Sequence, residues 1–278
     1  MSQQQEAIRI LRRAGEQGDD SLDLAETALA LAAIDQPQSP IDPYRAHLAS
    51  LAEQVRALGP ARQLDEQLRI LRRVLVVQNK YSGEEEHFDD IRNANLMHVI
   101  DRRRGLPVAL GILYLHVAEA VGWPMVGLNF PGHFFVRLAA ADGRAIIDPF
   151  RAGQTCHPDD LHEFLPYGEE DEETERELAP DCCDPVSKRD VLLRLQNNVK
   201  RRLLDQDRLD PAIATLQGMI LFAPRRHELW RELGYLQAER GNLRSAITAL
   251  EVVRDLTGEV VPIRQADDML RQLRRQLN

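Results

Sequence analysis

The sequence predicts an α+β protein that is mainly helical, with one buried helix and a small antiparallel sheet between two helical segments. Three observations support this fold class. Apolar residues recur at helical spacing over about the first 100 residues. The pattern then changes to one apolar helix and three short strand-like runs, which is typical of an α+β core. Residues 186–278 return to helical spacing and contain an internal repeat.

The first segment is predicted to be helical. One helix has an apolar stripe at spacings of three and four, formed by Leu22, Leu24, Ala25, Ala28, Leu29, Leu31 and Ala32. Residues 36–40 end this helix, because the two prolines there supply no amide hydrogen and clash with the preceding turn. Two more amphipathic helices are predicted over residues 44–58 and 64–78, with Gly59-Pro60 between them.

The second segment contains the buried helix and the strands. Residues 106–121 are apolar enough for a buried helix, and Gly122 can end it in a left-handed conformation. Strand-like runs follow over residues 125–130, 133–139 and 144–150, separated by turn residues. This piece is small for an independent core, so we expect the preceding helices to wrap it.

An acidic run over residues 168–175 follows the strands. Such densely packed like charges resist burial and are typical of an exposed linker. We therefore divide the chain into residues 1–167, an acidic linker over 168–185, and a helical domain over 186–278.

The helical domain resembles tetratricopeptide (TPR) repeats. Ala212 and Ala246 lie 34 residues apart in similar apolar frames, and 34 residues is the length of a TPR unit. The series Trp230, Leu233, Gly234 also matches the W-x-x-L-G opening of that repeat. A helical hairpin with chance spacing is the alternative, and the combined matches favour a TPR-like domain.

Composition excludes several classes of protein. The formal charge of −9 disfavours a nucleic-acid binder, whose affinity depends on neutralising phosphates. No apolar run approaches the roughly 20 residues that a membrane span needs, and the amino terminus lacks a secretory pattern. The cysteines Cys156, Cys182 and Cys183 suggest no disulfide framework. We expect a cytoplasmic protein that binds neither nucleic acid nor membrane.

His133 and Asp148 lie on two neighbouring strands of the predicted sheet. In a papain-type site a thiol opens a helix, a histidine on a neighbouring strand takes its proton, and an acid orients the imidazole. The motifs Gly122-Trp123-Pro124, His133-Phe134-Phe135-Val136 and Ile146-Ile147-Asp148-Pro149 resemble the transglutaminase-like version of this arrangement.

The position of the thiol is occupied by proline. Counting back from Gly122 by the helix length usual in the transglutaminase-like family reaches Pro107, which has no nucleophile but suits the first position of a helix. We interpret His133 and Asp148 as a vestigial pair that braces the sheet or takes part in binding. Their use with another nucleophile, including activated water, is the alternative.

Other nucleophiles and metal ligands are weaker candidates. Cys156, beside His157, follows a loop instead of opening the buried helix, and Cys182-Cys183 lie beyond the acidic run. We interpret all three thiols as bystanders. No two histidines of this region have the i, i+4 spacing of a helical zinc motif, so we predict no metal and no cofactor. The histidines considered are His87, His98, His116 and His133.

The order of motifs resembles the SirB-one family of bacterial proteins. The motifs are Arg103-Arg104-Gly105-Leu106-Pro107, Asn129-Phe130-Pro131-Gly132-His133-Phe134 and Ile147-Asp148-Pro149-Phe150, followed by the TPR-like tail. That family joins a transglutaminase-like core to TPR repeats, and its core also resembles a region of some eukaryotic F-box proteins. The resemblance implies the fold but no transferable activity. Its members generally lack the thiol, so Pro107 fits the family pattern.

These observations predict a non-catalytic protein that acts as a scaffold or regulator. We expect a groove near Arg104, Asn129 and His133, together with the TPR-like helices, to bind a protein or peptide. The alternative is an acyl hydrolase or transferase that uses His133 and Asp148, with Cys156 or with water. An inert core joined to a TPR adaptor is a third reading.

Overall fold

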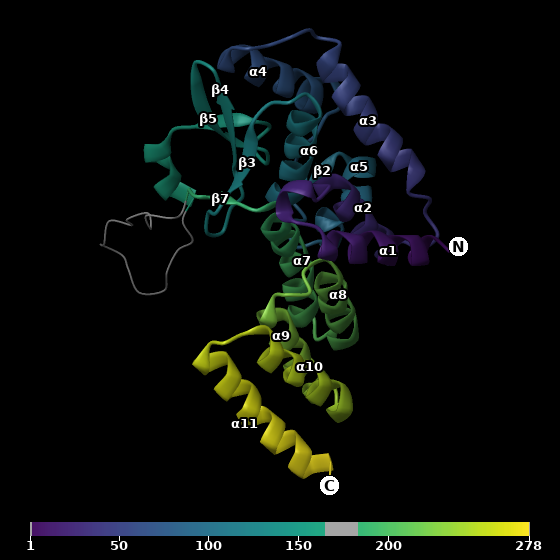
Figure 1. Ribbon diagram of the computed structural model, residues 1–278. Helices are drawn as coiled ribbons and strands as arrows, with labels where there is room; N and C mark the ends of the chain where they lie inside the picture. Colours follow the sequence, from purple (N-terminus) through teal and green to yellow (C-terminus); the bar gives the residue numbers. More distant parts are fainter. Residues whose placement is uncertain (1, 165–182, 278) are drawn as a thin grey trace.

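The computed structural model describes residues 2–164 and 183–277, and Figure 1 shows their arrangement. Helices of the amino-terminal part lie around one side of a small sheet. The carboxy-terminal helices extend away from that body as a stack (Figure 1). The predicted α+β fold class, mainly helical with a small antiparallel sheet, is confirmed.

The amino-terminal helices agree with the sequence pattern. They are α1 (Gln3–Glu16), α2 (Leu24–Asp35), α3 (Asp42–Arg56) and α4 (Leu64–Leu71), with a short 3-10 turn η1 (Asp19–Ser21). Helix α2 begins after an Asp23 side chain that caps Glu26 N, and it ends immediately before Gln36. The third predicted helix continues past Leu71 as a π-helical segment, η2 (Arg72–Gln78).

The sheet contains the three predicted strands and two more. Its order is β6 (Gln154–Cys156), β5 (Gly143–Asp148), β4 (Val136–Ala140), β3 (Met125–Leu128) and β7 (Pro185–Val186), and all of its pairs are antiparallel. The sequence analysis expected His133 on the middle strand. Strand β4 begins only at Val136, so His133 lies in the loop between β3 and β4. The predicted alternation holds, because Phe134, Val136 and Leu138 enter the main core while Phe135 belongs to the cluster on the other face.

Helix α6 (Pro107–Ala120) is the predicted buried helix. It packs against α2, α3, α7 and the sheet strands β3 and β4. Gly122 follows it with φ of +75°, the left-handed conformation expected at a helix end. The segment before α6 comprises β1 (Ser82–Gly83), η3 (Ile91–Ala94), α5 (Leu96–Arg102) and β2 (Arg104–Gly105), with β1 and β2 paired in parallel. A further 3-10 segment, η4 (Pro158–Phe164), follows β6.

The carboxy-terminal region is helical, as predicted. It comprises α7 (Lys188–Asp205), α8 (Leu209–Phe222), α9 (His227–Glu239), α10 (Leu243–Leu256) and α11 (Val260–Leu277). Neighbouring helices pack as antiparallel pairs, α7 with α8 and α9 with α10. Ala212 and Ala246 are both fully buried, and a Cβ on Gly234 would lie 2.6 Å from Leu250 Cγ, so α9 and α10 approach closely.

The hydrophobic core is continuous across Pro185, where the sequence analysis divides the chain. Helix α8 packs on α1, and α7 packs on α2 and α6. One buried cluster accordingly includes Leu29 of α2, Leu113 of α6, Leu195 of α7 and Leu216 of α8. Most of the expected acidic linker, residues 168–182, lies outside the described residues. Among the described helices, none is long and apolar enough to span a membrane.

Candidate functional site

The start of α6 carries no nucleophile. Pro107 is the first helical residue and is buried, and Leu106 precedes it in an extended conformation. Leu106 N donates a 2.9 Å hydrogen bond to Asn93 O, and Leu106 O accepts one of 3.0 Å from Leu110 N. Proline fits this position because a first-turn amide has no partner within the helix. The first residue of α6 is therefore a buried ring without a nucleophilic atom.

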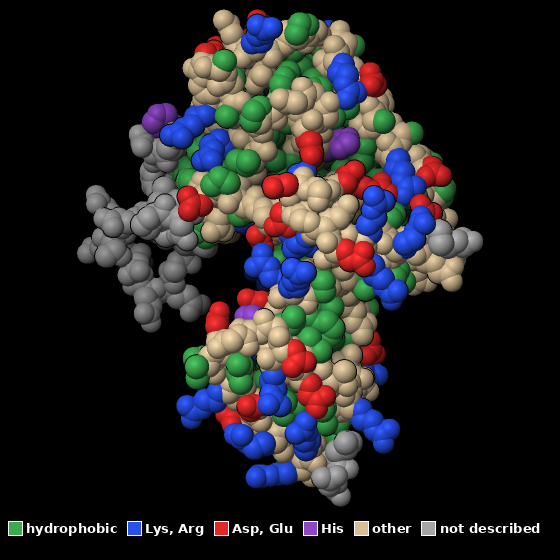
Figure 2. Space-filling model, viewed as in Figure 1, with side chains coloured by type: hydrophobic (Ala, Val, Ile, Leu, Met, Phe, Trp, Pro, Cys, Tyr) green, Lys and Arg blue, Asp and Glu red, His purple; other side chains and the backbone are tan. Residues whose placement is uncertain are grey.

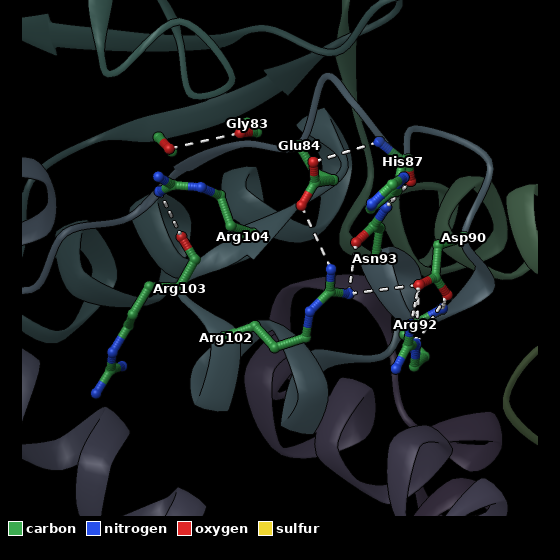
Figure 3. A network of polar contacts seen from close by, with 10 residues as sticks. Gly83, Glu84, His87, Asp90, Arg92, Asn93, Arg102, Arg103 and Arg104 are labelled. Carbon is green, nitrogen blue, oxygen red and sulfur yellow. Dashed lines mark hydrogen bonds and ion pairs between the residues drawn. The ribbon is translucent and has the colours of Figure 1, made fainter.

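A polar network fixes the chain immediately before Pro107 (Figure 3). Asn93 is fully buried, and its side chain accepts from Arg102 Nη1 at 2.9 Å and donates to His87 O at 2.6 Å. Arg102 also donates to Glu84 Oε2 at 3.3 Å. Because Asn93 O also accepts the hydrogen bond from Leu106 N, this network holds the beginning of α6 in place.

Arg103 and Arg104, which follow Arg102 in the chain, contact other residues. Arg103 has φ of +60°; its Nη1 donates to the Tyr81 hydroxyl and lies 2.7 Å from His47 Nε2. Arg104 is exposed, and its Nη1 contacts Lys80 O at 3.3 Å. In Figure 3 these two side chains point away from the Asn93 network that holds Arg102.

His133 and Asp148 form the predicted pair. His133 Nε2 lies 2.9 Å from Asp148 Oδ1, and the Asp148 side chain is completely buried. The same Oδ1 accepts from Phe150 N at 2.8 Å and Arg151 N at 3.2 Å. Because a carboxylate oxygen only accepts, Nε2 carries the proton and Nδ1 of a neutral ring is left as an acceptor. Within the described chain Asp148 Oδ2 has no hydrogen-bond partner.

Aromatic rings and two glycines set the position of the His133 loop. The imidazole lies 4.6 Å from the Phe135 ring, centre to centre, and 5.2 Å from the Phe164 ring. The next side chain, Phe134, occupies a slot in which a Cβ on Gly111 would come within 2.4 Å and a Cβ on Gly127 within 2.7 Å. The loop is thus anchored on α6 and β3 by one ring.

A cavity of about 590 Å³ lies between the start of α6, the β3–β4 loop and α7. It brings together three residues that the sequence analysis singled out, Pro107, Asn129 and His133. Arg104 does not line it, so the expected groove is corrected on that point: the Arg104 side chain points to carbonyls at the β2 edge. A cavity of this size suits a small molecule or a short peptide segment.

Helix α7 forms a wall of the cavity that sequence reasoning did not identify. Its contributions follow one helical stripe at spacings of three and four, namely Asp190, Leu193, Arg194, Asn197, Asn198 and Arg201. The stripe is visible in the sequence, but the sequence does not say which surface it faces. Lys and Arg side chains gather beside the hollow at the level of α7 (Figure 2).

Cys156 stands apart from this cavity. It lies on β6 opposite Ile146 and packs with an apolar cluster that includes Phe135 and Leu161. Burial, with the Asp148 carboxylate nearby, raises the pKa of the Cys156 thiol to about 11. The thiol is therefore protonated at neutral pH, the opposite of an activated nucleophile. Of the other two cysteines, Cys183 precedes β7 and Cys182 lies outside the described residues.

No metal-binding group is found among residues 2–164 and 183–277: no three His, Cys, Asp or Glu side chains converge there. Of the histidines considered from the sequence, His116 Nε2 contacts Leu48 O at 3.2 Å, and the His87 carbonyl belongs to the Asn93 network.

Comparison with known proteins agrees with this geometry. The family model of the transglutaminase-like superfamily matches residues 42–197, a range that includes Pro107, His133, Asp148 and the first half of α7. A UPF0162 protein of Xylella fastidiosa (strain 9a5c) is 30% identical over 240 residues, covering 83% of each chain. A UPF0162 protein of Vibrio cholerae is 28% identical over 220 residues, 78% of this chain and 80% of that one.

A shorter match links the core to a eukaryotic protein. F-box only protein 21 of Mus musculus is 35% identical over 77 residues, which is 28% of this chain and 12% of that protein. The longer matches include the core and part of the carboxy-terminal helices, as their coverage requires. Together with the helix start, the histidine loop and the buried aspartate, they establish that the chain belongs to the transglutaminase-like superfamily, alongside the UPF0162 proteins.

Proposed function

We propose that this protein is a cytoplasmic pseudoenzyme that binds a peptide segment of a partner protein in the cavity beside Pro107 and does not react with it. The observation that carries the proposal is the buried Pro107 at the start of α6, in the wall of a cavity that also contains His133. Papain-type chemistry requires a thiolate at that helix start. Proline at that position supplies no nucleophile, while the cavity beside it is retained.

The remaining polar groups suit binding. His133 is held by Asp148 so that its Nδ1 can accept a hydrogen bond from a ligand N–H. Asn129 lies in the same wall, and its backbone N is already engaged by Asp184 O at 2.9 Å. Its side-chain amide can donate to or accept from a peptide group. Hydrogen bonds of this kind hold an extended peptide without any covalent step.

The thiol-based alternative receives no support from Cys156. That residue does not line the cavity, and its thiol pKa is raised to about 11. A water-based hydrolase would need only His133 and Asp148, so the experiment below includes turnover as an outcome.

We also propose that α7–α11 form a TPR-like scaffold, as in the SirB-one family. In its support, Ala212 and Ala246 are 34 residues apart and both fully buried in paired helices. In this proposal the scaffold holds α7 against the core and thereby completes the cavity.

The experiment compares binding with turnover. Dye-labelled nonapeptides, acetylated and amidated, in acidic, neutral and basic versions, are titrated with the full chain by fluorescence anisotropy and then examined by mass spectrometry. We expect at least one version to bind and none to be cleaved or acylated. Asn197 is exposed on the cavity side of α7, so Asn197→Trp should block binding. Gln206→Trp, at the exposed end of the same helix, is the matched control and should bind normally.

Two results would contradict the proposal. One is cleavage or acylation of a peptide by the wild type that is lost in His133→Ala. The other is peptide binding that Asn197→Trp leaves unchanged, since the binding surface would then lie elsewhere.

A further inference from the structure

We propose that the cavity selects a peptide with two side-chain carboxylates three residues apart, one bound by Arg194 and the other by Arg201. This inference rests on the proposed function, because it names the ligand class of the same site.

Arg194 is a partly buried cation that pairs with no anion among the described residues. Its guanidinium donates to His133 O and lies over the Phe134 ring at 5.6 Å from the centroid. Among the described residues no carboxylate is in hydrogen-bonding or ion-pair contact with it. Burial alone lowers the pKa of this guanidinium. A desolvated charge is costly unless it is paired, so this side chain is best satisfied by an anion that enters the cavity.

Asp190, the acidic residue on the same wall, already has partners of its own. Asp190 precedes Arg194 by one helical turn, but its carboxylate accepts from Ser187 Oγ at 2.7 Å and from Arg226 Nη2. Arg194 donates one hydrogen bond within the described chain, to His133 O, and a guanidinium has five N–H groups. A fork of parallel N–H groups is the geometry that a carboxylate accepts bidentately.

Arg201 supplies a second cation at a defined distance. It lines the same cavity seven residues further along α7, two helical turns or about 10 Å from Arg194. It is exposed, and in the described parts of the chain it makes no ion pair. Its neighbours differ: Lys200 pairs with Glu232 at 2.5 Å, and Arg202 is buried against Phe88. Arg194 and Arg201 are thus the two cations of this wall left for a ligand.

The spacing favours one peptide pattern. In the polyproline II conformation, side chains three residues apart share a face and lie about 9 Å apart along the axis. This matches the roughly 10 Å between the two arginines. An acidic residue, two arbitrary residues and a second acidic residue therefore fit the wall, with peptide groups facing Asn129 and Asn197.

The test uses four labelled nonapeptides with acetylated amino termini. Three are amidated and contain Glu-x-x-Glu, Glu-x-x-Gln or Gln-x-x-Gln; the fourth contains Gln-x-x-Gln and has a free carboxyl terminus. Dissociation constants are measured by anisotropy with the full chain at 50 mM and 500 mM NaCl. We expect the Glu-x-x-Glu peptide to bind at least tenfold more tightly than its Gln-x-x-Gln counterpart at low salt.

Two variants test the contribution of each arginine to binding, and a third is the control. Arg194→Gln should weaken binding of the Glu-x-x-Glu peptide on the order of tenfold to a hundredfold, because a partly desolvated charged hydrogen bond is lost. Arg201→Glu, at an exposed position, should weaken it several-fold at 50 mM NaCl and less at 500 mM. Arg12→Glu, on the exposed surface of α1, is the control and should change nothing beyond a twofold range.

The outcomes separate this inference from the proposed function. If Gln-x-x-Gln binds as tightly as Glu-x-x-Glu and Asn197→Trp still blocks both, the charge inference is wrong and peptide binding stands. If the peptide with the free carboxyl terminus binds as well as amidated Glu-x-x-Glu, the cavity recognises a terminus and the inference is also wrong. If no peptide of any composition binds, both the charge inference and the proposed peptide binding are wrong.

Discussion

Gly111 of α6 faces Phe134 so closely that a Cβ at position 111 would lie 2.4 Å from Cε1 of the ring. Real carbon atoms do not approach to that distance, so only glycine lets the ring enter. The contact fixes the residue next to His133 from the middle of the buried helix. Sequence spacing alone places these residues 23 positions apart and gives no sign of the contact.

Gly111→Ala should destabilise the protein. The displaced Phe134 ring is expected to cost about 1–3 kcal/mol, only partly offset by the better helix propensity of alanine. Gly218→Ala is the matched control, because it also lies inside a helix but its Cβ would have 3.8 Å of clearance to Leu31 Cδ2. Urea unfolding of both variants measures the difference. Equal stability of the two variants would show that the Phe134 slot is not tight.

The arginines before Pro107 are expected to contribute unequally to the stability of the protein. Arg102→Ala should reduce the free energy of unfolding by about 1–3 kcal/mol, because buried Asn93 and Glu84 lose a charged donor. Arg104→Ala should change it by less than about 0.5 kcal/mol, since that side chain is exposed. Chemical denaturation checks both values. An Arg104→Ala loss as large as that of Arg102→Ala would contradict the arrangement in Figure 3.

Cys156 should alkylate slowly. With a pKa of about 11, its thiolate fraction at pH 8 is roughly a hundredth or less of that of a free thiol. The rate with iodoacetamide should rise about tenfold per pH unit between pH 7 and 10. Peptide mapping by mass spectrometry distinguishes Cys156 from the other cysteines. Alkylation at the rate of a model thiol at pH 7 would revive the thiol-based alternative.

Pro107→Cys should create a reactive thiol where the native chain has none. The start of a helix favours a thiolate, and His133 lines the same cavity. In a Cys156→Ser background we expect position 107 to alkylate at least tenfold faster at pH 7 than Cys156 does in the wild type. His133→Ala added to Pro107→Cys should slow that reaction. A rate that is indifferent to His133 would mean that the imidazole does not face the helix start.

His47 predicts a pH dependence of stability. Burial and the adjacent Arg103 cation lower the pKa of His47 to about 4, below its value of about 6.5 in the unfolded chain. The unfolded state therefore binds more protons between pH 6.5 and 4, and stability falls as the pH falls through that window. Because the side chain is partly exposed, we expect a loss of only about 1–2 kcal/mol from this group.

His47→Gln keeps a polar partner for Tyr81 but cannot take up a proton. Its stability should decline less than that of the wild type between pH 6.5 and 4.5, as measured by urea unfolding at several pH values. Parallel pH profiles for the two proteins would assign the titration to other groups.

Local patterns predicted much of the fold. The stripes of α2 and α3, the apolar length of α6 and the turn residues around β4 and β5 each act over a few residues, so the sequence reveals them directly. The parallel pair of β1 and β2 was not predicted. It joins Ser82 to Arg104 with two residues on each side, too few for any periodicity.

Part of the arrangement around His133 follows from motif spacing. The sequence paired His133 with Asp148, and their side chains lie 2.9 Å apart. It placed His133 on a strand, whereas the residue lies in the loop before β4. The roles assigned to Pro107, His133 and Asp148 stay predictions. Arg104 was misplaced, since its direction depends on the left-handed Arg103 before it. The α7 wall was missed because its position depends on packing between segments far apart in the sequence.

Helix α7 belongs both to the hydrophobic core and to the wall of the cavity. Its eighteen residues seal the interior with Val191, Leu192 and Leu195 and line the cavity with Arg194 and Arg201. A chain cut before α7 would keep the histidine and the aspartate but lose one wall of the cavity and expose the apolar core beneath it. Truncation at this point therefore cannot test the cavity on its own, because it would disturb the fold at the same time.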